Sequence, residues 1–190
     1  MRIVLVGPPG AGKGTQAVLL AKRLSIPHIS TGEMIRGEIS SGSELGTRVK
    51  AVNDRGELVS DKLMKELVRA RLAHADCKTG FLLDGYPRTV PQVADFDEIL
   101  SGLGVKLDTV IEFSVPQDVL IGRVKARAAM KAAGAGRADD DEAVAAKRLQ
   151  VYEAQTAPLL ELLRPRGIVR RIDGMGSVDE VSARISAVLS

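Results

Sequence analysis

A glycine-rich segment near the start of the chain, residues 7–15 (Gly-Pro-Pro-Gly-Ala-Gly-Lys-Gly-Thr), constrains the fold more than any other feature. It follows residues 3–6, an apolar run rich in β-branched side chains that is typical of a buried strand. It leads into residues 16–24, whose composition and periodicity predict a helix. This order predicts a phosphate-binding loop, in which backbone N–H groups, a helix N-terminus and the cation of Lys13 converge on a phosphate.

The rest of the chain alternates strand-like and helical segments, as α/β proteins do. The strand-like runs are residues 2–6, 27–29, 80–83, 109–115 and 168–172. Several are almost continuously apolar, which is typical of strands covered on both faces in a parallel sheet. For 190 residues we expect one domain with a doubly wound fold of the phosphate-loop NTPase type. Its five-stranded parallel sheet is flanked by helices, and ligands bind at the carboxyl ends of the strands.

Several helix starts are marked by capping residues. Ser30 with Glu33, and Ser177 with Glu180, have the spacing of a capping box. Ser60-Asp61 opens a further helix. These signals place helices directly after several of the predicted strands.

Two stretches interrupt the simple alternation. Residues 31–59 hold two short helical segments separated by residues 41–43. Residues 128–136 are low in complexity and end in glycines. We expect both stretches to be mobile excursions from the ligand edge of the sheet, not linkers between domains.

The composition excludes several classes of protein. Cys77 is the only cysteine, which excludes an internal disulfide framework and a cysteine-based zinc site, so we expect a protein of the reducing cytoplasm. No apolar stretch approaches the roughly 20 residues that cross a bilayer, and the first residues do not resemble a signal peptide. The net charge of +3 comes from dispersed basic residues, so we expect no nucleic-acid partner.

Residues 30–36 (Ser-Thr-Gly-Glu-Met-Ile-Arg) follow the second predicted strand. Thr31 is placed to hydrogen-bond a ligand and Arg36 to meet a phosphate, although a helix cap and a solvated arginine would explain the same residues. Their position at the carboxyl end of a strand favours ligand binding.

Residues 84–88 (Asp-Gly-Tyr-Pro-Arg) end the third predicted strand, and Gln92 follows one helical turn later. Asp84 stands where phosphate-loop enzymes hold Mg²⁺, usually through water. Gly85 allows a close backbone approach, and Arg88 offers a planar pair of donors. A simple Asp-Gly turn would not require the arginine.

A third group of charged residues follows the fourth predicted strand. Arg123 and Arg127 are four residues apart and share one helix face. Arg137 and Arg148 follow, on either side of the acidic residues 139–142. Taken alone, the arginines have an exposed charged face as their ordinary explanation, and the acidic run could be only a helix start.

Together these blocks resemble the nucleoside monophosphate kinases, and the adenylate kinase family above all. In the loop, Gly14 directly follows Lys13 and Thr15 comes one residue later, where the generic phosphate loop has Ser or Thr after the lysine. The resemblance covers essentially the whole chain. It rests on the phosphate loop, residues 30–36, residues 84–88 with Gln92, residues 136–140 and residues 156–159.

Adenylate kinases transfer the terminal phosphoryl group of ATP to AMP, reversibly and with Mg²⁺, giving two ADP. The resemblance implies an ATP site made of Gly10, Ala11, Gly12, Lys13, Gly14, Thr15, Arg123, Arg127 and Gly176. It implies an AMP site made of Thr31, Arg36, Glu57, Leu58, Val59, Gly85, Tyr86, Pro87, Arg88, Gln92, Arg137 and Arg148. It implies catalytic roles for Lys13, Arg88, Arg127, Arg137, Arg148 and Asp139, the last as an orienter of arginine.

The resemblance also implies Mg²⁺ bound with the nucleotide through water near Asp84 and Thr15, and no structural metal. The acceptor is a phosphate oxygen of AMP, which is largely ionised at pH 7 because its second pKa is about 6. No general base is needed, so we expect neither His28 nor His74 to take part. Catalysis then depends on positioning and charge neutralisation.

The family pattern divides the chain into a core of residues 1–29, 60–126 and 140–190, an NMP-binding segment of residues 30–59 and a short lid of about residues 127–139. The lid contains no cysteine, so we expect no zinc. Alanines favour helix and Gly134 favours a helix end, so we expect the preceding helix to reach about Ala133. Lys131 could then replace Arg127 as the contact to ATP. We expect a monomer.

Three other functions compete with this interpretation. A uridylate or cytidylate kinase shares the loop and the fold, although Thr31 with Gln92 fits an adenylate pattern better. A GTPase-type switch would need Asn-Lys-x-Asp, and the only asparagine, Asn53, is followed by Asp54. A non-catalytic nucleotide-binding regulator would not need the full set of arginines.

Overall fold

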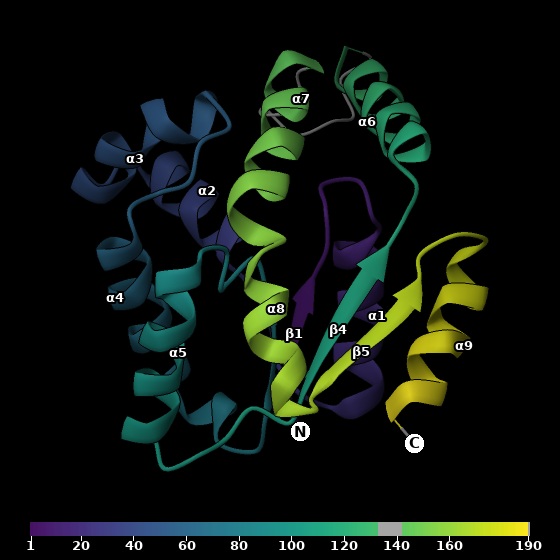
Figure 1. Ribbon diagram of the computed structural model, residues 1–190. Helices are drawn as coiled ribbons and strands as arrows, with labels where there is room; N and C mark the ends of the chain where they lie inside the picture. The colour runs from purple at the N-terminus through teal and green to yellow at the C-terminus, as the bar shows by residue number, and fades with distance from the viewer. Residues whose placement is uncertain (133–141, 190) are drawn as a thin grey trace.

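The fold is a parallel sheet between two layers of helices (Figure 1). The computed structural model describes residues 1–132 and 142–189. The strands are β1 (Arg2–Val6), β2 (His28–Ser30), β3 (Phe81–Asp84), β4 (Thr109–Ser114) and β5 (Val169–Asp173). They pair in the order β2-β3-β1-β4-β5, and every pairing is parallel. The predicted fold class is confirmed, and each predicted strand lies within about one residue of an observed strand.

Helices connect these strands and cover both faces of the sheet. They are α1 (Lys13–Leu24), α2 (Thr31–Ser41), α3 (Glu44–Asp54), α4 (Asp61–Leu72), α5 (Val90–Gly102), α6 (Gln117–Ala132), α7 (Glu142–Val151), α8 (Leu159–Leu163) and α9 (Val178–Leu189). Short helical turns are η1 (Ala75–Cys77), η2 (Tyr152–Thr156) and η3 (Arg164–Arg166). None of the described helices combines the length and the apolar character that a membrane crossing requires.

The apolar core has two parts, one on each face of the sheet. Successive residues of a strand point to opposite faces, so Val4 and Val6 join the cluster under α4, α5 and α8. Ile3 and Leu5 join the cluster under α1 and α9. Because both faces are buried, β1 is apolar along nearly its whole length.

Capping residues set several helix starts, as their spacing predicted. Ser177 and Glu180 form a reciprocal capping box, with N–H to oxygen distances of 2.7 and 3.3 Å. The backbone N–H of Glu33 donates to Ser30 Oγ at 3.4 Å. α4 begins at Asp61 as predicted, but Ser60 makes no side-chain cap.

The predicted segment of residues 31–59 is a pair of helices, α2 and α3, set apart from the sheet (Figure 1). The two helices touch at Gly46, where an added Cβ would lie 2.1 Å from the Glu38 carbonyl oxygen. Ser43 Oγ caps α3 and also donates to the Glu38 carboxylate at 2.6 Å. The hairpin is therefore closely packed within itself.

We expect the core to be far less tolerant of truncation than the surface. Leu82→Ala removes a side chain that is 0% exposed and should lower the free energy of unfolding by about 2–5 kcal/mol. Leu162→Ala is the matched control, since Leu162 is 47% exposed, and should change it by less than about 0.5 kcal/mol. Denaturant unfolding measures both. Equal effects would contradict the placement of β3 at the centre of the core.

Candidate active site

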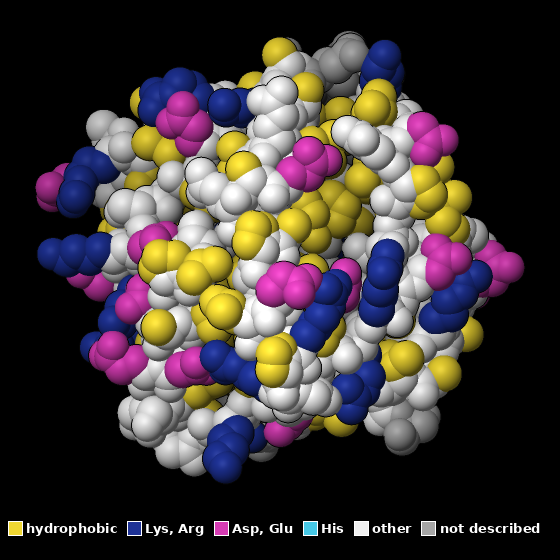
Figure 2. All heavy atoms as spheres, viewed as in Figure 1, with side chains coloured by type: hydrophobic (Ala, Val, Ile, Leu, Met, Phe, Trp, Pro, Cys, Tyr) yellow, Lys and Arg dark blue, Asp and Glu magenta, His cyan; other side chains and the backbone are white. Residues whose placement is uncertain are grey.

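The carboxyl edge of the sheet opens into a cavity of about 1050 Å³. Figure 2 shows the surface hollowed between α6 and α7, with hydrophobic side chains on the walls. The cavity brings together the predicted residues Gly10, Ala11, Gly12, Lys13, Gly14, Thr15, Thr31, Arg36, Glu57, Leu58, Val59, Asp84, Gly85, Pro87, Arg88, Gln92, Arg123, Arg148 and Gly176. Residues that are distant in the sequence therefore share one site.

The phosphate loop joins β1 to α1 at the floor of this cavity. Gly12 precedes α1 with a φ of 91°, a conformation that favours glycine. Lys13 Nζ donates to the carbonyl oxygens of Gly7 and Pro8, at 2.6 and 3.0 Å. The ammonium group is thus held on its own loop, beside the backbone N–H groups at the start of α1.

Three arginines from different elements lie near one another in the lining of the cavity. Arg88 follows β3, Arg36 lies on α2 and Arg148 lies on α7. Burial lowers the pKa of Arg88, Asp84 opposes this, and the positive charges of Arg148 and Arg36 lower it further. Like charges gathered in this way attract a polyanion such as a phosphate.

A tight turn after β3 holds Arg88 in place. Gly85 has a φ of 91°, and its carbonyl oxygen accepts from Arg88 Nε at 2.7 Å. The same oxygen accepts from the Thr31 hydroxyl at 2.9 Å. Thr31 is 1% exposed, and its hydroxyl proton is engaged in this hydrogen bond. The hydroxyl oxygen can still accept a hydrogen bond. The turn thereby ties α2 to β3.

The lining of the cavity includes the apolar side chains of Ile35, Leu58, Val59 and Met64. Gln92 adds a polar group to it. Its Oε1 accepts from the backbone N–H of Arg88 at 2.7 Å, and its Nε2 donates to Asp61 at 2.6 Å. The arrangement suits a planar base with a few hydrogen-bonding atoms.

Asp61 is a residue that sequence reasoning did not connect with the site. Ser60-Asp61 indicated only a helix start, and nothing in the sequence pairs that position with Gln92, 31 residues later. Tyr86 is the opposite case, because the resemblance placed it in the AMP site and the structure places its side chain elsewhere. Its side chain is buried against Phe96, at a ring distance of 5.8 Å, and does not line the cavity.

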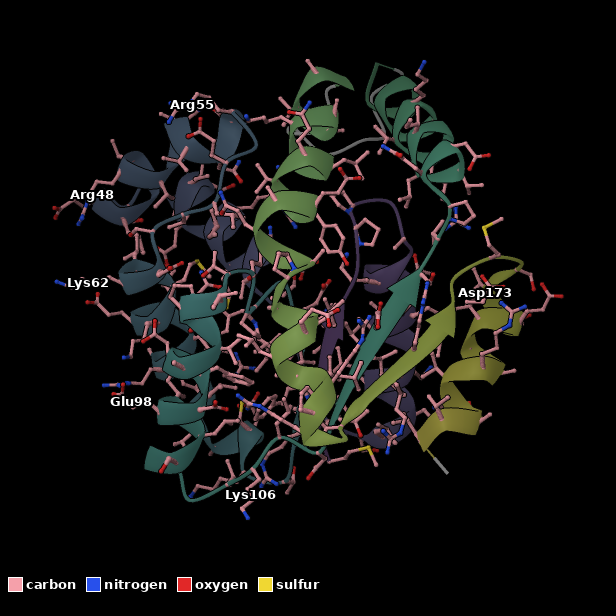
Figure 3. All side chains as sticks on the ribbon, viewed as in Figure 1. Arg48, Arg55, Lys62, Glu98, Lys106 and Asp173 are labelled. Carbon is pink, nitrogen blue, oxygen red and sulfur yellow. The ribbon has the colours of Figure 1, made fainter. Side chains whose placement is uncertain are left out.

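Arg123 forms the wall on the other side of the phosphate loop. Its Nη1 donates to the Gly10 carbonyl at 3.3 Å and its Nη2 to the Gly174 carbonyl at 3.2 Å. It therefore bridges the loop to the turn after β5, where Figure 3 shows Asp173. That turn carries Gly176, which lines the same cavity.

The α2–α3 hairpin meets α7 at the far rim. An added Cβ on Gly56 would lie 2.9 Å from the Val144 carbonyl oxygen and 3.2 Å from Arg148 Cγ. Arg55, labelled in Figure 3, donates to the neighbouring Glu57 at 2.9 Å, and this contact lowers the pKa of Glu57. Contact between the hairpin and α7 encloses the site on this side.

Oxygen donors suited to Mg²⁺ lie in the cavity. The Asp84 carboxylate, at the end of β3, and the Thr15 hydroxyl both line it. Elsewhere in residues 1–132 and 142–189, no group of three or more His, Cys, Asp and Glu side chains is arranged to hold a metal ion. These residues fit a cation that arrives with a nucleotide. The absence of zinc remains a prediction.

Some predicted residues lie outside the described part of the chain. These are Arg137, Asp139 and the side chains of Arg127 and Lys131. Helix α6, which carries Arg127, runs to Ala132, the last described residue before the gap. Its proposed continuation to Ala133 lies outside the described residues.

The fold and the site define a phosphate-loop kinase. A parallel sheet carries the loop at the end of β1, and cations from several elements line the same cavity, together with apolar side chains and the Gln92 amide. The family model for adenylate kinase matches residues 5–168. The chain belongs to the adenylate kinase family.

Similar proteins align over the full chain. An adenylate kinase of Stenotrophomonas maltophilia is 48% identical over 189 residues, covering 100% of this chain and 99% of the relative. An adenylate kinase of Thermobifida fusca is also 48% identical, covering 100% and 98%. One of Brucella ovis is 48% identical over 191 residues, covering 100% and 98%.

The turn after β3 provides a test of the arginine site. In Gly85→Ala the new Cβ would lie 2.5 Å from Thr31 Oγ1 and 2.7 Å from Arg88 Nη2, so both side chains must shift, and the φ of 91° is strained for alanine. We expect the KM for AMP to rise at least about 10-fold, as for one lost charged contact. Gly102→Ala, where a Cβ meets nothing within 4 Å, should leave it unchanged. An unaltered KM in Gly85→Ala would show that the turn does not position Arg88.

Proposed function

We propose that the chain moves the terminal phosphoryl group of ATP onto AMP by holding the two nucleotides on opposite sides of the phosphate loop. Adenylate kinase activity follows from the family match and from relatives 48% identical over the full chain. The assignment of residues to roles is the proposal. The observation that carries it is the grouping of Arg36, Arg88 and Arg148 in the same cavity as Lys13.

In this proposal the phosphates of ATP bind the N–H groups of residues 10–15 and the ammonium of Lys13. Lys13 leaves the carbonyl oxygens of Gly7 and Pro8, which a phosphate oxygen outcompetes because it carries charge. Arg123 flanks the phosphates, and the turn at Gly176 lies along the adenine.

AMP occupies the other half of the cavity. Its phosphate meets Arg36 and Arg88, with Arg148 between the two nucleotides. Its base enters the slot lined by Leu58 and Val59, beside the Gln92 amide. Glu57, Thr31, Gly85, Pro87 and the Tyr86 backbone complete this AMP site.

The reaction needs no general base. An ionised oxygen of the AMP phosphate forms a bond to the γ-phosphorus of ATP, and the bond to the β,γ-bridging oxygen breaks, leaving two ADP. Lys13, Arg88 and Arg148 neutralise charge on the transferred group and keep the reacting oxygens in line. Mg²⁺ bound with ATP would add charge neutralisation, and it would be held through water near Asp84 and Thr15.

Further parts of the proposal rest on the resemblance alone. Arg127, Arg137 and Asp139 would complete the site from a short lid at about residues 127–139, and residues 30–59 would form the NMP-binding segment. The remaining residues, 1–29, 60–126 and 140–190, would form the core. We propose a cytoplasmic monomer without a zinc ion.

An acceptor assay tests the function. With ATP and Mg²⁺, we expect AMP to have a higher kcat/KM than CMP, UMP or GMP, because the Gln92 amide and the apolar slot suit adenine. A coupled assay of ADP formation measures all four. A higher kcat/KM for CMP or UMP would favour the pyrimidine nucleotide kinase, and absence of transfer to every acceptor would favour a binding regulator.

Lys13→Ala tests the phosphate loop. We expect a folded protein whose kcat is at least about 10²-fold lower, since one preorganised charge at the transferred group is lost. Lys22→Ala, an exposed lysine of the same helix, is the matched control and should be as active as the unaltered chain. Near-normal turnover in folded Lys13→Ala would exclude the role assigned to Lys13.

A further inference from the structure

Asp61, the first residue of α4, links the start of α4 to the start of α5, which carries Gln92. Its carboxylate accepts from Gln92 Nε2 at 2.6 Å and from the Thr89 hydroxyl at 3.1 Å. Thr89 is the N-cap of α5, and its Oγ1 accepts from the backbone N–H of Gln92 at 3.3 Å. The Asp61 carboxylate thus holds the side chain of Gln92 directly and the backbone of Gln92 indirectly, through Thr89.

These contacts allow only one orientation of the Gln92 amide. The backbone N–H of Arg88 can only donate, so the amide atom 2.7 Å from it must be the oxygen. A carboxylate accepts, so the amide atom facing Asp61 must be the nitrogen. Gln92 is 2% exposed, and rotation of its amide would oppose donor to donor and acceptor to acceptor in a buried place.

A fixed amide presents a fixed order of donor and acceptor to a ligand. After its contacts with Asp61 and Arg88, Gln92 keeps one N–H and one oxygen lone pair. On adenine, N1 accepts and the 6-amino group donates, which complements that pair. On hypoxanthine, which has nearly the same shape, N1 donates and O6 accepts, so the order is reversed.

We propose that Asp61 is a positioning residue that makes the acceptor site selective for adenine by fixing the orientation of the Gln92 amide. The inference rests on the proposed function, in which the base of AMP lies beside Gln92. Asp61 does not line the cavity, so its effect on the base passes through Gln92. Asp61 is partly buried and Tyr86 and Phe96 pack nearby, where burial raises the pKa of the Tyr86 hydroxyl, helped by the charges of Asp95 and Asp61. A hydrogen bond to a charged group is strong in such surroundings.

The experiment compares AMP with inosine monophosphate as acceptors. The readout is the ratio of their kcat/KM values with ATP and Mg²⁺, together with the separate KM values for AMP and ATP. In Asp61→Ala we expect the ratio to fall about 10-fold, the size of one lost charge-assisted hydrogen bond, with a higher KM for AMP and an unchanged KM for ATP. Asp61→Asn keeps an acceptor without the charge, so its ratio should fall about 3-fold.

Glu44→Ala is the matched control, because Glu44 is likewise the first residue of a helix in this part of the protein and is exposed. Its ratio should equal that of the unaltered chain. A second comparison tests the route through Gln92. In a Gln92→Ala background, Asp61→Ala should change the ratio no further, whereas a purely structural role would lower activity toward both acceptors in either background.

An unchanged ratio in folded Asp61→Ala overturns the inference, and so does an undiminished effect of Asp61→Ala in the Gln92→Ala background. If Asp61→Ala does not fold, Asp61→Asn decides the question, and an unchanged ratio there overturns it equally. The proposed function fails separately, when the unaltered chain transfers no phosphoryl group to AMP. Its activity toward AMP is therefore measured first.

Discussion

Parallel pairing of β1 with both β3 and β4 is the constraint on which the site depends. Parallel strands end at the same edge, so the loop after β1 and the turn after β3 must lie side by side. The phosphate loop follows one strand, and Asp84 with Arg88 follows the other. The β5 turn that carries Gly176 meets them at the same edge, one strand beyond β4. Burial of both faces of the sheet holds these ends in register, so the apolar core also positions the charged cavity.

Backbone carbonyl groups hold several of the cations that face this cavity. Lys13 donates to Gly7 and Pro8, Arg123 to Gly10 and Gly174, and Arg88 to Gly85. A carbonyl group orients a cation but carries no net charge. A phosphate therefore displaces the carbonyl, or binds beside it, more readily than it would displace a carboxylate paired with the cation. This pattern is suited to catalysis by positioning, in which groups must be oriented before the substrate arrives and then attract a polyanion.

The part of the cavity lining that includes Gln92 has a different physical character. The lining also includes the apolar side chains of Leu58, Val59 and Met64, and contacts with Asp61 and with the Arg88 backbone fix the orientation of the Gln92 amide. Asp61, Thr89 and Gln92 tie the start of α4 to the start of α5, and the same network reaches the backbone of Arg88. The orientation of the Gln92 amide and the placement of Arg88 are therefore mechanically joined.

The sequence by itself determined the strands, the phosphate loop and the capped helix starts, because these depend on residues a few positions apart. Residues 7–15 and the Ser177–Glu180 box are of this kind. The family resemblance then allowed fewer than half of the residues that line the cavity to be named, the three arginines Arg36, Arg88 and Arg148 among them. Only the tertiary structure decided which of them touch. Thr31 meets Gly85 across 54 residues, Asp61 meets Gln92 across 31, and the Tyr86 side chain packs in the core away from the cavity. Such contacts depend on how helices pack around the sheet, and the spacing of nearby residues in the sequence does not determine that packing.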